Sequence, residues 1–160
     1  MGCSILRGES AVDLAASPGG WSFVALDHGA TVTAVDRSPL EDGLMDHPRL
    51  RFVQGDAFKF KPEKPVDWLL ADIAAYPERT LELVKRWLGE GWCQRLVATV
   101  KFTGTEGYGI LEDFKRMLSA AAHDFRIRKL LENKNEATVM AWRTAKDCSG
   151  DDSQGVASAT

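Results

Sequence analysis

The sequence predicts an α/β domain built on a mostly parallel sheet with helices on both faces. Apolar runs bounded by turn residues alternate with segments of helical periodicity from residue 11 to residue 142, a pattern typical of a parallel sheet covered on both sides. The last two apolar runs are separated by little more than the polar stretch ENKNE, which is too short for a crossover helix. They are therefore expected to pair as an antiparallel hairpin at the end of the sheet.

The first strand is expected close to the amino terminus. AVDLAA at 11–16 is a short apolar run that ends in a Gly-rich turn, and TVTAVD at 31–36 forms the second run. Later apolar runs of strand length complete a set of seven strands. They lie at 50–54, 66–72, 95–101, 125–131 and 137–142.

Three helices are expected between these strands. Residues 20–28 follow the Gly-rich turn. In 77–89, apolar side chains recur at helical spacing and the pattern stops at Gly89 and Gly91, as is common where helices end. Residues 109–123 carry charges of alternating sign, which indicate a solvated helix face. Helices and strands thus alternate along most of the chain.

The composition indicates one domain, expected at 11–144. Residues 1–10 are interpreted as an N-terminal remnant, and the small, acidic and polar residues 145–160 as a disordered tail. The formal net charge of -3 is unusual for a protein that holds a large nucleic acid by itself, because phosphate neutralisation needs clustered Lys and Arg. We therefore expect a small ligand, or a nucleic-acid partner held by another segment.

Cysteine, histidine and apolar content argue against several kinds of site. The three Cys and three His residues have neither the spacing of a disulfide framework nor that of a zinc site. No metal is therefore expected, and a reducing cytoplasmic location fits best. No stretch has the length of a membrane span and no secretory signal is present, so a membrane partner is not expected.

The turn after the first strand, Ser17-Pro18-Gly19-Gly20, indicates close approach of a ligand to the backbone. Asp36 ends the second strand, where a carboxylate accepts hydrogen bonds from two ribose hydroxyls. These features suit either a nicotinamide oxidoreductase or a methyltransferase. The dehydrogenase pattern G-x-G-x-x-G is absent, and Pro18 removes one amide that a pyrophosphate would use. Together with the terminal hairpin, this favours methyl transfer and leaves the oxidoreductase as a disfavoured alternative.

Several stretches together resemble the FtsJ family of RNA ribose 2′-O-methyltransferases. DLAASPGGWS at 13–22 is similar to the cofactor loop of that family. GDAFKFKP, WLGEGWCQR and the strand ending at Lys101 are most similar to members that act on bacterial 23S ribosomal RNA. The similarity extends from residue 11 to residue 142. It implies a Rossmann-like S-adenosylmethionine-dependent methyltransferase fold and an RNA substrate.

The resemblance also implies a binding site for S-adenosylmethionine. The implied contacts come from Ser17, Pro18, Gly19, Gly20, Trp21, Asp36, Asp56, Ala57 and Asp72. In this assignment Asp36 binds the ribose, Asp56 binds the adenine amino group, and Ala57 offers its amide to a ring nitrogen. The turn residues approach the methionine part, with Trp21 behind them. Two simpler interpretations stay open, since Asp56 suits a turn cap and Trp21 suits the core.

The catalytic set of the family is a lysine, an aspartate, a second lysine and a glutamate, and Asp72, Lys101 and Glu136 match the last three. A ribose 2′-hydroxyl is a poor nucleophile, so methyl transfer to it needs a base. Lys101 is the expected base and acts only as a neutral amine. Nearby carboxylates favour its charged form, whereas the positive sulfonium of the cofactor favours the neutral form. The three side chains are expected to meet where the strands end.

Two departures from the family pattern affect these expectations. Ala15 replaces the glycine of DLGAxPGG, which strains the turn if its φ angle is positive. The first catalytic lysine of the family lies on a helix before the cofactor loop, and MGCSILRGES at 1–10 contains no lysine. The resemblance also implies an amino-terminal RNA-binding module in the related full-length enzymes, so RNA binding is expected to need an additional segment, absent here. A cofactor-binding domain without its own catalytic activity is the alternative to a methyltransferase.

Overall fold

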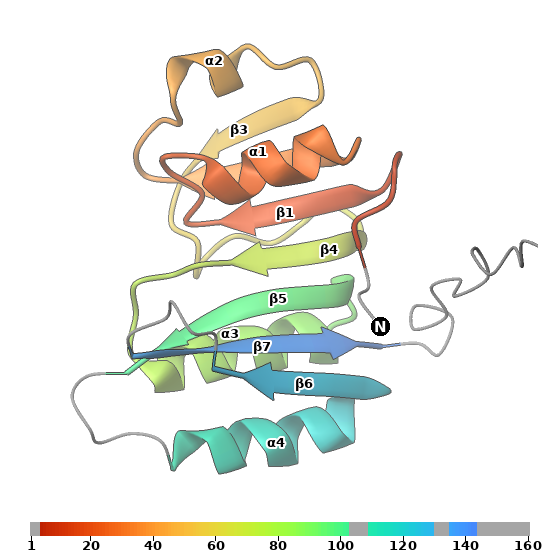
Figure 1. The fold of residues 1–160 in the computed structure, drawn as a ribbon, viewed down its shortest axis with the longest axis vertical. Helices are drawn as coiled ribbons and strands as arrows, with labels where there is room; N and C mark the ends of the chain where they lie inside the picture. Colours follow the sequence, from red (N-terminus) through yellow and green to blue (C-terminus); the bar gives the residue numbers. More distant parts are fainter. Residues whose placement is uncertain (1–3, 103–108, 130–134, 144–160) are drawn as a thin grey trace, which may run out of the picture.

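The computed structural model of this chain describes residues 4–102, 109–129 and 135–143, which form one seven-stranded sheet and four helices (Figure 1). The strands are β1 (Ser10–Leu14), β2 (Thr31–Asp36), β3 (Leu50–Gln54), β4 (Val66–Ala71), β5 (Cys93–Lys101), β6 (Asp124–Arg128) and β7 (Glu136–Trp142). The helices are α1 (Gly20–Asp27), α2 (Asp42–Met45), α3 (Pro77–Gly89) and α4 (Ile110–Ala121). The predicted fold class is confirmed.

The strand order is β3-β2-β1-β4-β5-β7-β6. Strands β1 to β5 pair in parallel, whereas β7 pairs antiparallel with both β5 and β6. In Figure 1 the arrowheads of β1, β4 and β5 therefore point to one edge of the sheet, and β7 begins at that same edge. The expected terminal hairpin is confirmed. Strand β7 follows β6 in the sequence and lies between β5 and β6 in the sheet.

Two hydrophobic cores cover the two faces of the sheet. On one face, α3 and α4 pack on the sheet, with Trp87 and Phe114 fully buried. On the other face, α1 packs over β1, β2 and β4, with Ala25 and Leu26 buried. Leu44 of the short helix α2, which the sequence pattern did not predict, packs against this second core. None of the helices in the described ranges has the length and apolar character needed to cross a membrane.

Several element boundaries differ from the prediction. Ser10 already belongs to β1, and Glu9 accepts a hydrogen bond from Trp68 Nε1 and forms an ion pair with Arg95, so the chain joins the sheet before residue 11. Strand β6 ends at Arg128, earlier than predicted. The last two residues predicted for that strand and the predicted tail at 145–160 lie outside the described residues.

Strand β1 ends two residues earlier than predicted because the backbone turns at Ala15. Its φ angle is 60°, in the left-handed region, and its N–H donates to the carbonyl oxygen of Val35 at 2.9 Å. An L-residue in this region costs about 1–2 kcal/mol, because its Cβ approaches the following carbonyl oxygen. The glycine that Ala15 replaces in the family pattern has no such cost.

We expect Ala15→Gly to raise the free energy of unfolding by about 0.5–1 kcal/mol, since relief of the left-handed strain exceeds the added chain entropy of glycine. Urea unfolding followed by circular dichroism measures the change. Ala16→Gly is the matched control: Ala16 is buried and its φ is not positive, so this change should destabilise the protein. Equal destabilisation by both substitutions would contradict the strain at Ala15.

Candidate active site

The turn after β1 is held by the segment that follows β2. The N–H of Ser17 donates to Asp36 Oδ2 at 3.0 Å, and Ser17 Oγ donates to the carbonyl oxygen of Pro39 at 2.9 Å. The N–H of Glu41 donates to the carbonyl oxygen of Pro18 at 3.0 Å. The predicted residues Ser17 to Gly20 thus lie beside the predicted residue Asp36. The carboxylate of Asp36 holds the turn in place through its hydrogen bond with Ser17.

The two glycines of the turn have different roles. Gly19 has a φ of 123°, and a Cβ at this position would collide with Leu44. Its lack of a side chain is therefore explained by the backbone angle and by packing against α2. A Cβ at Gly20 would meet nothing within 4 Å. Gly20 is exposed, so open space lies beside the backbone at this position.

A cavity of about 290 Å³ lies where β1, β2, β3 and β4 end. Its walls include Ala15, Asp36, Gly55, Asp56, Ala57 and Ile73. Carboxylates stand beside apolar side chains in this wall, and a Cβ at Gly55 would meet nothing within 4 Å. Arg37 and Arg79 also line the cavity, so its wall combines apolar side chains with charged groups of both signs, and such polar groups orient a small ligand.

Asp56 both lines this cavity and caps a turn. Its Oδ1 accepts the N–H of Phe58 at 2.9 Å, and its Oδ2 accepts Arg37 Nη2 at 2.7 Å. The Phe58 hydrogen bond, followed by the Arg37 guanidinium, lowers the pKa of this carboxyl below its usual value. The turn-cap interpretation is therefore correct, and it coexists with a position in the cavity wall.

Two further predicted cofactor contacts, Ala57 and Trp21, lie close to the core. Ala57 is 9% exposed and lines the cavity. Trp21 is half-buried and packs against the core under α1, as the simpler interpretation of this side chain expected.

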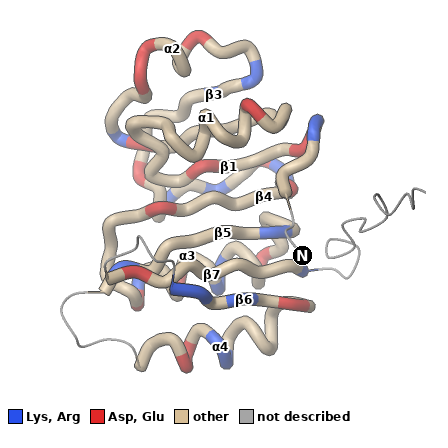
Figure 2. Tube along the Cα trace, in the orientation of Figure 1, with Lys and Arg blue, Asp and Glu red and all other residues tan. Residues whose placement is uncertain are grey.

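Lys101, Asp72 and Glu136 meet at the same edge of the sheet. Lys101 Nζ lies 3.0 Å from Asp72 Oδ1 and 3.8 Å from Glu136 Oε1. Lys101 and Glu136 are direct partners in the β5–β7 pairing, and Asp72 follows the end of the neighbouring β4. Acidic and basic residues accordingly gather where β4 and β5 end and β7 begins (Figure 2). The structure therefore brings together three side chains that are far apart in sequence.

Thr99 supports this cluster and was not predicted. Its Oγ1 donates to Asp72 Oδ1 at 2.5 Å, the same oxygen that Lys101 contacts, and the residue is 5% exposed. Residues two apart on a strand face the same side, so the position of Thr99 before Lys101 was a usable signal. Within the described residues, no group of three or more His, Cys, Asp or Glu side chains is arranged to hold a metal ion.

The model of FtsJ-like methyltransferases matches residues 3–131. The chain belongs to the FtsJ-like methyltransferase family. The family resemblance expected from the cofactor loop and from Lys101 is confirmed.

Curated relatives add to this assignment. Ribosomal RNA large subunit methyltransferase M of Alkalilimnicola ehrlichii is 35% identical over 145 residues, covering 89% of the chain and 40% of the relative. The protein of that name from Pseudomonas putida is 39% identical over 119 residues, covering 74% and 33%. The chain thus spans two fifths or less of the length of these relatives.

The structure of Burkholderia thailandensis 1,6-didemethyltoxoflavin-N1-methyltransferase, which contains bound S-adenosylhomocysteine, matches with a TM-score of 0.61. It is 20% identical and covers 86% of this chain and 72% of its own. At this identity the likeness concerns the fold alone.

Asp13 is a buried acid beneath the turn of this FtsJ-like chain, and it too was not predicted. It is 1% exposed, and its Oδ2 accepts Ser22 Oγ at 2.6 Å. Burial raises its pKa to about 7, even though hydrogen bonds from the side chain and backbone of Ser22 lower it. A single carboxylate inside the apolar run AVDLAA was the available signal, since acids are rarely buried without a partner.

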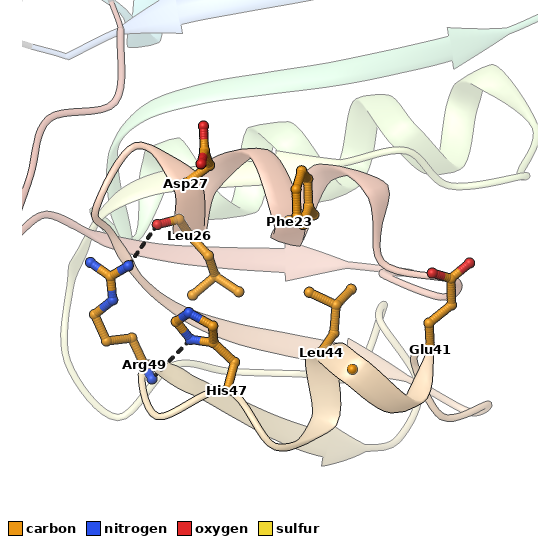
Figure 3. A pocket seen from close by; sticks show the side chains of 8 residues that line it. Phe23, Leu26, Asp27, Glu41, Leu44, His47 and Arg49 are labelled. Carbon is orange, nitrogen blue, oxygen red and sulfur yellow. Dashed lines mark hydrogen bonds between the residues drawn. The ribbon is translucent and has the colours of Figure 1, made fainter.

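A second, separate cavity lies behind the turn, between α1 and the segment 41–49. It has a volume of about 460 Å³, and Phe23, Leu26 and Leu44 form its apolar part (Figure 3). Arg49 Nη2 donates to the carbonyl oxygen of Leu26 at 2.8 Å and closes one side. None of the predicted site residues lines it. It is connected to the turn through Leu44, which packs on Gly19.

We expect the stability gain from Asp13→Asn to grow as the pH rises. The native carboxyl keeps its proton up to about pH 7, whereas the unfolded chain releases it near pH 4, so the stability that this proton contributes is lost as the pH rises through that window. The asparagine side chain of the variant does not titrate. Urea unfolding should show the difference between variant and wild type rising by about 2–3 kcal/mol between pH 5 and pH 8. Asp27→Asn, an exposed change on α1, should show a constant difference, and a constant difference for Asp13→Asn would refute the raised pKa.

Proposed function

We propose that this FtsJ-like chain transfers a methyl group from S-adenosylmethionine to a ribose 2′-hydroxyl of RNA, with 23S ribosomal RNA as the substrate. The observation that carries the proposal is the convergence of Lys101, Asp72 and Glu136 at the edge that also holds the Gly-rich turn and the cavity. The names of the relatives support a ribosomal RNA substrate. The chain spans two fifths or less of the length of those relatives. We place the larger part of RNA binding in the part of the relatives that this chain does not span.

The residues present fit the cofactor. The open space at Gly20 suits the methionine part, and the cavity beside Asp36 and Asp56 suits the adenosine part. Asp36 already accepts the N–H groups of Ser17 and Ser38, and each carboxylate oxygen has a further lone pair for a ribose hydroxyl. The amide of Ala57 and the carboxylate of Asp56 are the groups for the adenine edge.

Lys101 is the proposed general base. The cofactor supplies a methyl group activated by a positively charged sulfur. The neutral Lys101 amine would accept the proton of the ribose hydroxyl while the hydroxyl oxygen forms the new bond to the methyl carbon, and the bond from that carbon to sulfur would break with its electron pair remaining on sulfur. Asp72, held by Thr99, and Glu136, held by its β7 register, fix the direction of the amine. General-base assistance of this kind contributes about 10²–10⁴-fold to a rate.

The surroundings of Lys101 include two carboxylates, whose oxygens lie within 4 Å of Nζ. In this proposal Lys101 acts as a base once cofactor and RNA are both bound, because a cationic cofactor close by and exclusion of water by the RNA disfavour a charged amine.

The test is transfer of a labelled methyl group to transcribed 23S RNA, with nucleoside analysis of the product. Lys101→Ala should lower the rate at least 100-fold while the dissociation constant of S-adenosylmethionine changes less than twofold. Asp36→Ala should weaken that constant about tenfold, because charge-assisted hydrogen bonds contribute about 1.5–3 kcal/mol. Lys115→Ala on α4, whose lysine pairs with Glu112 at the surface, should leave both values unchanged.

Two results would overturn the proposal. One is a methyl group found on a base instead of a ribose. The other is wild-type activity in Lys101→Ala. Cofactor binding without any transfer by the wild-type chain would favour the alternative of a cofactor-binding domain without its own activity.

A further inference from the structure

We propose that Asp13 is a positioning residue for the cofactor turn, and that its charge makes the affinity for S-adenosylmethionine rise with pH. The inference rests on the proposed function, because it concerns the same cofactor. Asp13 has no part in the chemistry proposed for Lys101. It acts through the backbone of the turn.

The position of Asp13 connects the two ends of the turn. Asp13 lies on β1 and Ser22 lies in the first turn of α1, so the hydrogen bond between them spans the residues that form the turn. Both side chains are buried, at 1% and 0% exposure. Water therefore does not substitute for this contact, and its strength bears directly on the turn geometry.

The ionised carboxylate is the better partner for α1. Gly19 provides no side-chain cap for this helix, and its first turn contains no acidic residue. Asp13 takes the place of such a cap from the neighbouring strand, since Ser22 Oγ donates to its Oδ2 and the backbone of Ser22 also favours its ionised form. A carboxylate accepts at both oxygens, and negative charge is favourable at a helix N-terminus. A protonated carboxyl gives up one acceptor position to its own hydrogen.

The surroundings of Asp13 hold its ionisation close to neutral pH. Burial raises its pKa to about 7, and the negative charges of Asp72, after β4, and Asp36, at the end of β2, add to this effect. From α1, the neutral donor Ser22 acts in the opposite direction. A cation placed among these three carboxyl groups would favour the ionised form of Asp13.

Binding of a cation and loss of the Asp13 proton are therefore coupled. S-adenosylmethionine carries a sulfonium charge that its product S-adenosylhomocysteine lacks. If the sulfonium ligand binds only the form with Asp13 ionised, the fraction of protein able to bind it rises from about one tenth at pH 6 to about nine tenths at pH 8, which is about a tenfold change in affinity. The product lacks the sulfonium charge and discriminates less between the two forms of Asp13, so its affinity should change less and the preference for cofactor over product should increase with pH.

The experiment is isothermal titration calorimetry of the whole chain with S-adenosylmethionine and S-adenosylhomocysteine at pH 6, 7 and 8. The α-amino group of each ligand titrates in this range, but equally for every variant. The measured quantity is therefore the affinity relative to Asp13→Asn, which keeps a hydrogen-bond acceptor and loses the charge. Wild type relative to Asp13→Asn should gain about tenfold for S-adenosylmethionine between pH 6 and pH 8, and less than half of that for the product. Asp27→Asn should behave as wild type.

Ser22→Ala is a second test variant, for which the pH profile of the affinity should shift in one stated direction. Loss of the donor removes an interaction that lowers the pKa of Asp13, so the midpoint of the pH profile should move to higher pH. Identical profiles for wild type and Asp13→Asn, or an unmoved midpoint in Ser22→Ala, would overturn the inference. Absence of binding of either ligand at every pH would instead overturn the proposed function on which it rests.

Discussion

The candidate site depends on the direction of the strands. Strands β1 to β5 run parallel, so the loops that follow them all emerge at one edge, and β7 begins there because it runs antiparallel. Sites in open α/β sheets form at this carboxyl edge. The Gly-rich turn, Asp36, the cavity and the Lys101 cluster are consequences of that single arrangement. Exchange of β6 and β7 in the strand order would move Glu136 away from Lys101.

A second property of the site is its excess of negative charge. Among the described residues, Asp13, Asp36, Asp56, Asp72 and Glu136 stand at or beneath this edge, whereas the positive charges there come from Lys101, Arg37 and Arg79. Such an environment favours a cationic ligand over an anionic one. It is also costly, because a buried acid such as Asp13 opposes folding once it ionises. A buried acid departs from the rule that protein cores are apolar, and such departures are expected where a protein binds its ligand.

Much of the fold and of the site was predictable from the sequence, for identifiable reasons. Strands β2 and β3 and helix α3 have the predicted bounds because turn residues and Pro77 mark their ends. The meeting of Asp72, Lys101 and Glu136 followed from the strand pattern and the family resemblance. The contact of Leu44 with Gly19 arises from packing between distant segments, which local sequence does not encode. Local signals did exist for Ala15, which replaces a glycine of the family pattern, and for Thr99, which lies two residues before Lys101, but the φ angle of Ala15 and the hydrogen bond from Thr99 to Asp72 required the structure.

The most direct measurement of the central account is a ¹H–¹⁵N NMR titration of the labelled chain with S-adenosylhomocysteine. If the carboxyl edge is the cofactor site, the amide shifts should concentrate at Ser17, Gly19 and Gly20, at Asp36, and at Gly55 to Ala57. The residues that line the cavity between α1 and the segment 41–49 should show small amide shifts. These shifts should be transmitted by Leu44, which packs on Gly19. Shifts confined to Phe23, His47 and Arg49, with the Gly-rich turn and Asp36 unaffected, would contradict the account.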